Sequence, residues 1–421
     1  MLVGCLKNLL KKMRQIYRFA NFLVKAFPSF IRVASCDKKL LAQHGPMCTP
    51  NSVAELLQAL IRIPSVNPFA LDAASAPYVG ELRCAQFIGE FLESLGAAVT
   101  LDEVEPDRPN VIGHFSSNNG RGKPRVLLAP HIDTVSVQGM TIDPFAAEIR
   151  DGRIYGRGAS DTKGTMAAML WALHELGPRV ADLNVDVTFV GFVGEENGQP
   201  GSKHFAKHRP DYDFAVVGEP TNLDVVYTHK GTTWLQVVAR GKSAHGSRPE
   251  LGENAILKLA RALDHLDRTL TPILKTFSDP VLGHSTMNIG QCQGGSQPNI
   301  VPDKATARLD FRLTPGLAKR GLLDLLQEHL PDGIEIEGIL QCNALATDPE
   351  HPLVTTLAAA GSGQKVGAPW FCDAAHLAAV GIPSVAAGPG SIDQAHTEDE
   401  WIEIEALEKG VDFYRGFLET C

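Results

Sequence analysis

The sequence lacks paired or closely spaced cysteines. Its 421 residues include eight cysteines, none of which belongs to a CxxC pair or to a dense framework. A disulfide scaffold is therefore not expected, and reduced thiols in an intracellular compartment are the simplest interpretation. Internal repeats and low-complexity tracts are also absent from the sequence.

Acidic residues are nearly missing from the first 46 residues, which contain nine Lys or Arg and one acid, Asp37. The formal net charge of −9 for the whole chain therefore divides into +8 for this leader and −17 for the remainder. An acidic body does not favour nucleic-acid binding, so no nucleic-acid partner is expected.

The basic leader also lacks an uninterrupted apolar run long enough to span a bilayer, because Arg14, Arg18 and Lys25 interrupt it. We therefore expect neither a transmembrane helix nor a stable membrane anchor in this segment. Three interpretations stay open: an organellar transit peptide, an interfacial helix, or a start site at Met47 that leaves residues 1–46 outside the mature protein. The expected location is cytoplasmic, or organellar if the leader is a transit peptide.

The composition, with 44% hydrophobic and 21% charged residues, is that of an ordinary soluble protein with enough chain for two domains. A capping box at Ser52 and Glu55 marks the first regular helix. Helical patterns cover 55–63, 82–95 and 165–176, and strand patterns cover 99–104, 126–130 and 186–194. This alternation predicts an α/β domain with a mostly parallel sheet and helices on both faces.

The pattern changes within residues 228–342, where strands and helices follow the order βαββαβ. This order predicts a ferredoxin-like α+β sandwich. Because His396, a candidate site residue, lies beyond this unit, we expect the sandwich to be inserted into the first domain. That domain then comprises residues 47–227 and 343–421.

Polar residues follow the apolar strand pattern at 126–130 directly. His131 and Asp133 are two residues apart, so in an extended segment their side chains share one face. The Asp133 carboxylate could then hold the His131 ring, as acids do behind histidines that bind metal ions. A surface hydrogen bond is the alternative for an isolated His and Asp at a strand end.

Other apolar runs end in the same way. Glu195 and Glu196 follow one run, and Glu219 follows another. A third run is followed by a Gly/Pro loop that ends at His396. In open α/β sheets, ligands bind beyond the carboxyl ends of the strands, where these residues would converge with Asp161. Two histidines and several acids suit two metal ions better than one, with Asp161 as the bridging carboxylate.

Five motifs in order carry a family resemblance: PHIDTV, GRGASDTKG, GEENG, VGEPT and QAHTEDE. From about residue 50 to its end, the sequence resembles the metallopeptidase family that contains acetylornithine deacetylase, succinyl-diaminopimelate desuccinylase, aminoacylase and glutamate carboxypeptidase. The resemblance implies a phosphorylase/hydrolase-like catalytic domain and an inserted lid through which family members form homodimers. It also implies two divalent metal ions, with zinc expected and cobalt or manganese as alternatives.

The resemblance implies a role for each candidate residue. It places His131, Asp161 and Glu219 on one ion, and Asp161, Glu196 and His396 on the other. It makes Glu195 the general base and sets Asp133 behind His131. Within the lid it implies that His245 stabilises the oxyanion, in many dimeric members at the partner's site, and that Asn299 and Arg312 bind the carboxylate side of the substrate.

The expected reaction is hydrolysis of an N-acyl amino acid, most like that of acetylornithine deacetylase. Desuccinylation and dipeptidase or carboxypeptidase activity are alternatives, because all of these reactions share the metal ligands. A non-catalytic amino-acid-binding or dimerisation module is the alternative outside catalysis, although such a module would not need Glu195. The sequence departs from the family at PWFCDA, where Trp370 and Phe371 replace small residues near the substrate and predict a narrowed apolar acyl pocket.

Overall fold

The computed structural model describes residues 50–69, 72–116, 122–209 and 211–421. The leader predicted over residues 1–46 lies outside these residues, so its alternatives stay open. Within the described part of the chain, no helix has both the length and the apolar character needed to cross a membrane. Asn51–Cys421 form one compact unit.

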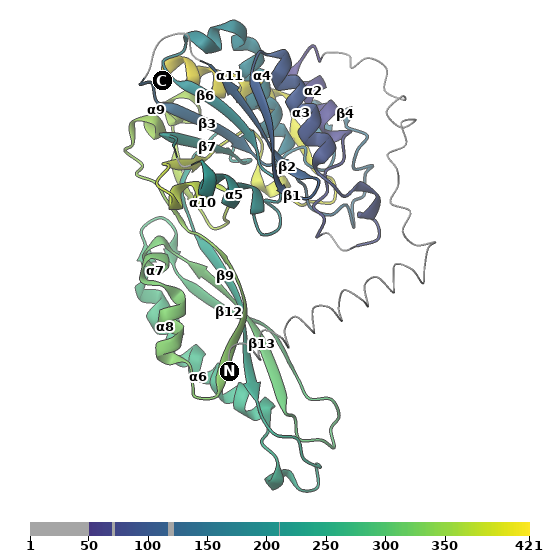
Figure 1. Ribbon diagram of the computed structural model, residues 1–421, viewed down its shortest axis with the longest axis vertical. Helices are drawn as coiled ribbons and strands as arrows, with labels where there is room; N and C mark the ends of the chain where they lie inside the picture. Colours follow the sequence, from purple (N-terminus) through teal and green to yellow (C-terminus); the bar gives the residue numbers. More distant parts are fainter. Residues whose placement is uncertain (1–49, 70–71, 117–121, 210) are drawn as a thin grey trace, which may run out of the picture. The chain divides into compact units, whose positions relative to one another are not determined.

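A large mixed sheet forms the centre of the part of this unit that contains α2 to α5 and α9 to α11 (Figure 1). Its strands lie in the order β1-β2-β6-β3-β7-β17-β8-β15, with β16 also paired to β8. In chain order they are β1 (Ala98–Glu105), β2 (Arg108–Phe115), β3 (Arg125–Pro130), β6 (Asp186–Gly191), β7 (Phe214–Gly218), β8 (Val225–His229), β15 (Leu345–Ala346), β16 (Lys365–Ala368) and β17 (Ser384–Ala386). The four strands β6, β3, β7 and β17 are mutually parallel, whereas β1 and β2 on one side and β8 and β15 on the other add antiparallel pairs.

Helices cover both faces of this sheet, as alternate side chains of β3 show. Val126 and Leu128 pack into the hydrophobic core under one set of helices, and Leu127 and Ala129 into the core under the other. The first set is α2 (Val53–Ile61), α3 (Leu82–Ser94), α4 (Lys163–Leu176), α9 (Pro352–Ala360) and α11 (Ile404–Thr420); the second is α5 (Pro200–His208) and α10 (Ala374–Ala379). Because β3 is buried on both faces, its sequence is continuously apolar.

A second, four-stranded sheet has the order β12-β13-β9-β14, with every neighbouring pair antiparallel. Its elements are β9 (Gly231–Arg240), α6 (Ala255–Thr276), the hairpin β10 (Ser278–Asp279) and β11 (Gly283–His284), β12 (Thr286–Gly294), β13 (Lys304–Leu313), α7 (Pro315–Arg320), α8 (Leu322–His329) and β14 (Ile334–Cys342). Figure 1 shows α6 and α8 beside this sheet. Leu259, Leu266, Leu270 and Leu274 of α6 are buried at helical spacing in a core separate from those of the large sheet.

A small sheet of β4 (Glu148–Arg150), β5 (Arg153–Tyr155) and β18 (Trp401–Glu403) joins distant parts of the chain. Trp401 pairs with Tyr155 in this sheet. The segment just before β18 therefore lies beside the loop that follows β5. Short 3-10 turns complete the described elements: η1 (Ala76–Tyr78), η2 (Gly177–Asp182), η3 (Pro249–Leu251) and η4 (Ile392–Gln394).

The predicted α/β fold class is confirmed; the large sheet is mixed, with four parallel strands at its centre and a further parallel pair, β16 with β8, at one side. The sequence patterns did not reveal β2, whose segment contains Pro109, Asn110 and Gly113, all poor strand residues. Partners supplied by the fold compensate for these residues, because Asn110 donates a hydrogen bond from Nδ2 to the Gly201 carbonyl at 3.0 Å. The inserted unit was predicted to begin at residue 228, whereas β8 stays in the large sheet through His229.

Candidate metal centre and active site

The carboxyl ends of the central parallel strands carry the candidate site. His131 directly follows β3, while Glu195 and Glu196 follow β6 within a few residues, and Glu219 directly follows β7. Because these strands are parallel neighbours, their polar ends meet at one edge of the sheet. Asp161 precedes α4, and a loop after β17 brings His396 to the same place.

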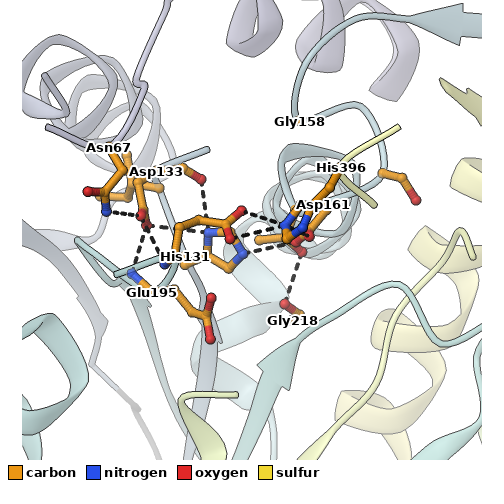
Figure 2. Close-up of polar contacts among 12 residues, drawn as sticks. Asn67, His131, Asp133, Gly158, Asp161, Glu195, Gly218 and His396 are labelled. Atoms are coloured by element: carbon orange, nitrogen blue, oxygen red, sulfur yellow. Dashed lines mark hydrogen bonds and ion pairs between the residues drawn. The ribbon is translucent and has the colours of Figure 1, made fainter. Parts of the chain in front are cut away.

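Asp161 lies between the two histidines (Figure 2). Its Oδ1 is 3.1 Å from His131 Nε2, and its Oδ2 is 3.3 Å from His396 Nε2. His396 Nε2 is also 3.1 Å from Glu196 Oε2. One carboxylate therefore faces two imidazoles with its two oxygens, as a bridging ligand would.

The His131 ring is oriented mainly by the backbone of Asp133. His131 Nδ1 lies 2.9 Å from the Asp133 carbonyl oxygen and 3.5 Å from the carboxylate Oδ1. The predicted carboxylate contact is thus the longer of the two. A donor hydrogen on Nδ1 leaves Nε2 as the nitrogen that faces Asp161 and that would bind a metal ion.

The Asp133 carboxylate also holds the turn after β6 in place. It accepts hydrogen bonds from the backbone N–H groups of Glu195 at 2.9 Å and Glu196 at 3.1 Å, and from Asn67 Nδ2 at 2.7 Å (Figure 2). Burial alone would raise the pKa of Asp133, but hydrogen bonds from His131 and Asn67 hold this pKa below its usual value. Asp133 is therefore ionised and ties the turn to the His131 strand.

Glu195 and Glu196 point to different partners, although they are adjacent in sequence. Glu196 contacts His396, whereas Glu195 Oε1 accepts a hydrogen bond from Gln199 Nε2 at 2.8 Å. Both side chains line the same cavity. This divergence agrees with an assignment of Glu196 to a metal ion and of Glu195 to proton transfer.

The site concentrates negative charge away from water. Burial raises the pKa of Glu195 and Glu219 well above the usual range; the Glu219 charge adds to the effect at Glu195, and the Asp161 charge adds to it at Glu219. Burial and the nearby Asp161 charge raise the pKa of Glu196 to about 7. Hydrogen bonds to Asp161 and Glu196 raise the pKa of His396 to about 10. Such a cluster stabilises positive charge at the point between its members, whether a proton or a metal ion.

The donor set fits a metal ion. His131, Asp161 and Glu196 each offer a ligand atom, and these atoms all lie within 4.8 Å of one another. Imidazole nitrogen and carboxylate oxygen are ligands that zinc, cobalt and manganese all accept. The fourth and fifth predicted ligands, Glu219 and His396, line the same cavity.

Glu400 supports the site, although its position in TEDE looks like part of a solvated charge run. Its carboxylate accepts hydrogen bonds from the backbone N–H groups of Gly158 at 3.0 Å, Ser160 at 2.9 Å and Asp161 at 2.9 Å. Arg157 Nη1 also donates to it at 2.7 Å. The side chain is buried and fixes the loop that presents Asp161. The register of β18 with β5 could not be read from the sequence, so this role was missed.

The cavity at the site has a volume of about 380 Å³. Its walls combine the acids and His396 with Arg312 of β13 and with apolar side chains. The apolar residues are Trp370, Phe371, Ile392 and Ala395. The two aromatic residues that interrupt the family pattern therefore face the reacting groups.

His245 and Asn299, by contrast, are not among the described residues that line this cavity. The two are neighbours within the four-stranded unit: His245 forms a β-bridge with Ile300, and the N–H of Gly246 donates to the Asn299 carbonyl at 2.7 Å. Both side chains are exposed. The structure thus brings Arg312 to the site within one chain and leaves His245 and Asn299 on the outer surface.

Comparisons with known proteins identify the family. The model of peptidase family M20/M25/M40 matches residues 127–420. The chain belongs to this family. The acetylornithine deacetylase of Proteus mirabilis is 32% identical over 384 residues, covering 87% of this chain and 96% of the relative. Members of the M20 family hydrolyse amide bonds, so the chain is a hydrolase of this class, as the sequence predicted.

Solved structures of other M20 proteins share the fold. Aminopeptidase PepT from Bacillus cereus aligns with a TM-score of 0.70 and 22% identity, covering 87% of this chain and 97% of that one. The YXEP protein of Bacillus subtilis, a dinuclear metal-binding peptidase of the M20 family, aligns with a TM-score of 0.61 and 15% identity, covering 87% and 97% respectively. The large mixed sheet is therefore the M20 fold.

Two buried histidines near the M20 site predict a pH dependence of stability. Burial lowers the pKa of His229 to about 4 and that of His376 to about 3. Both histidines are protonated in the unfolded chain below pH about 6.5, but stay neutral in the fold. The free energy of unfolding should therefore fall as the pH drops from about 6.5 towards 4, by roughly 1.4 kcal/mol per pH unit for each histidine.

Urea unfolding of wild type and His229→Gln at pH 7 and pH 5 measures the share of His229. At pH 5 the wild type should have lost about 2 kcal/mol more than the variant. Ligand protonation and metal release affect both proteins equally, so the comparison cancels them. Equal losses in the two proteins would show that His229 is not held neutral by the fold.

Proposed function

We propose that this M20 protein hydrolyses the amide bond of an N-acyl amino acid and releases an amino acid and a carboxylate. The reaction would use two divalent metal ions, and zinc is the metal we expect. His131, Asp161 and Glu219 would hold one ion, and Asp161, Glu196 and His396 the other. The observation that carries the proposal is the pair of contacts from the two oxygens of Asp161 to His131 and His396. When bound, the ions would supply positive charge that polarises the amide carbonyl and acidifies water.

Glu195 is the proton carrier in this proposal. It lines the cavity, and its carboxylate is not engaged by either histidine of the ligand set. Its raised pKa, caused by burial and by Glu219, matches the work of a base that accepts a proton from water and then passes it to the leaving amine. The half-buried setting limits competing water.

The residues that line the cavity suit a substrate with an uncharged acyl group at one end and the carboxylate of its amino acid at the other. Arg312 supplies a cation for the substrate carboxylate, although Asp310 Oδ2 already lies 3.0 Å from its Nη2. Trp370, Phe371 and Ile392 give the acyl side an apolar wall. No second Lys or Arg occurs among the described residues that line the cavity, which disfavours a succinyl group with its extra carboxylate. The likeness to acetylornithine deacetylases points the same way.

An assay of the purified protein on N-acetyl, N-propionyl, N-butyryl and N-succinyl derivatives of one amino acid tests this substrate class. The short uncharged acyl groups should be hydrolysed with the highest kcat/KM. Trp370→Ala should shift the preference towards the longer acyl groups by about 10-fold or more, because one methylene in an apolar pocket is worth roughly 1–3 kcal/mol. Preference of the wild type for the succinyl substrate would contradict the assignment.

We also propose that residues from about 230 to 342 form an inserted lid, through which two chains form a two-fold dimer. His245 would then act at the partner's cavity. Its ring is already oriented, because Ser247 N donates to His245 Nδ1 at 3.1 Å. Nε2 is consequently the protonated nitrogen and can donate to a developing oxyanion. This geometry supports a role for His245 in binding the oxyanion at the partner's cavity, since the side chain is exposed in its own chain.

Mixed dimers test the sharing of His245. Glu195→Ala and His245→Ala homodimers should each be inactive, whereas co-refolding the two in equal amounts should recover roughly a quarter of the wild-type activity, because half the dimers are mixed and one of their two sites is whole. Size-exclusion chromatography with light scattering checks that dimers form. A mixture that contains mixed dimers but is as inactive as its parents would contradict the sharing of His245 between subunits.

A further inference from the structure

Behind Glu195, two buried polar side chains continue its hydrogen bond into the protein. Gln199 Nε2 lies 2.8 Å from Glu195 Oε1, and Gln199 Oε1 lies 2.7 Å from His376 Nε2. Gln199 is fully buried and caps α5, with a left-handed backbone at φ 54°. His376 is 6% exposed and belongs to α10. Two helices on one face of the sheet thus meet behind the proposed base.

The direction of these hydrogen bonds follows from their chemistry. When it acts as the base, Glu195 is ionised and can only accept, so the Gln199 amide presents its NH2 group to it. The amide oxygen then faces His376, whose Nε2 must carry the proton and donate it. Burial lowers the pKa of His376 to about 3, so the ring remains neutral and keeps a single N–H. His376 thus donates a hydrogen bond to Gln199, and Gln199 donates one to Glu195.

We propose that Gln199 and His376 are positioning residues that hold Oε1 of Glu195 and leave Oε2 as the proton-accepting oxygen. This inference rests on the proposed role of Glu195 as base. A carboxylate side chain next to a cavity can rotate, and a mispositioned base loses rate because proton transfer needs hydrogen-bond geometry. The amide is held at both ends, so it limits this rotation without adding charge to the site.

A purely structural function is the competing explanation, since the contact also joins α5 to α10. A second contact between the same two helices provides a matched control for a purely structural effect. Ser202 Oγ of α5 donates to Asp373 Oδ1, the residue just before α10, at 2.5 Å. This second contact lies in the same interface and makes no hydrogen bond to Glu195; the Asp373 carboxylate acts on Glu195 only through its charge. A variant at Ser202 therefore weakens the helix pair without removing a hydrogen bond of the base.

The experiment compares four variants of the full chain on an N-acetyl amino acid. His376→Phe and Gln199→Leu break the chain of donors and should lower kcat by about 10- to 100-fold, the usual cost of losing a supporting hydrogen bond, with KM changed less than about threefold. His376→Gln places an amide N–H near the position of Nε2 and should restore kcat to within about fivefold of wild type. Ser202→Ala should lower the melting temperature but leave kcat within about twofold.

The double variant Gln199→Leu/His376→Phe shows whether His376 acts on Glu195 through Gln199, which we call the relay, or whether the two side chains act independently. If His376 acts through Gln199, the double variant should be no slower than Gln199→Leu alone. Metal content by elemental analysis should match wild type in every variant. In 15N-histidine spectra, the signal that disappears in His376→Gln should show an Nε2–H tautomer that does not titrate between pH 5 and 8.

Each outcome decides the matter. Equal losses in Ser202→Ala and His376→Phe, no rescue by His376→Gln, or an Nδ1–H tautomer would overturn the relay. Multiplicative losses in the double variant would do the same. If Glu195→Ala itself keeps full activity, the proposed base is wrong. If that variant is inactive while His376→Phe and Gln199→Leu are not, only the relay fails.

Discussion

Glu195→Ala is expected to lower kcat by a factor on the order of 10²–10⁴, because the variant has no group to accept the proton from water or to return it to the leaving amine. Elemental analysis should find the metal content unchanged. The physical reason is the divergence of the two adjacent acids: Glu196 contacts His396, whereas Glu195 contacts Gln199. Removal of the Glu195 side chain therefore leaves the ligand set intact.

The isosteric variant Glu195→Gln is the matched control for shape. It keeps the size of the side chain and a carbonyl oxygen that accepts from Gln199, but it cannot take a proton. It should be as slow as the alanine variant to within about tenfold. Loss of metal together with activity in either variant would mean that Glu195 and Glu196 have been assigned the wrong way round.

Asp161→Asn is expected to have the second large effect. Asp161 faces both histidines, so the neutral amide removes a negative charge and one oxygen ligand from both proposed ion sites. The loss of several kcal/mol of charge stabilisation corresponds to roughly 10³-fold or more in kcat/KM. Metal content should fall in parallel, in contrast to the Glu195 variants. A variant that keeps both its ions and its activity would exclude Asp161 as the bridge.

Ser160→Ala provides the control at the same loop. Ser160 Oγ donates to the Ser391 carbonyl at 3.1 Å and contributes no carboxylate. Its variant should keep metal and activity within about fivefold, since an ordinary hydrogen bond contributes about 1 kcal/mol. A loss as large as that of Asp161→Asn would show that the loop, not the charge, was damaged.

The strand-end residues could be predicted because each follows a strong local signal. The apolar run before His131 is buried on both faces, and period-two alternation sets the direction of the next side chains. The same reasoning gave different directions for Glu195 and Glu196, which the structure shows. The four long strands and the helices α6 and α8 of the second unit follow the predicted order βαββαβ, whereas the hairpin β10–β11 and the short helix α7 were not predicted.

Other parts depend on contacts between distant segments and left no local signal. Gln199 and His376 meet across 177 positions of sequence, and neither belongs to a motif. Glu400 reaches its loop only through the pairing of β18 with β5. Strand β2 contains residues that disfavour strands, and the fold supplies their partners. The Asp133 carboxylate lies 3.5 Å from His131 Nδ1, farther than the Asp133 carbonyl at 2.9 Å, and it accepts hydrogen bonds mainly from the turn of Glu195.

Removal and titration of the metal ions test whether hydrolysis depends on two metal ions at this site. The purified protein would be dialysed against a chelator, assayed on an N-acetyl amino acid, and then titrated with zinc while hydrolysis and bound metal are measured together. We expect the stripped protein to have less than about 1% of the starting activity and full activity to return at two bound zinc ions per chain. Hydrolysis that survives complete metal removal would contradict the account.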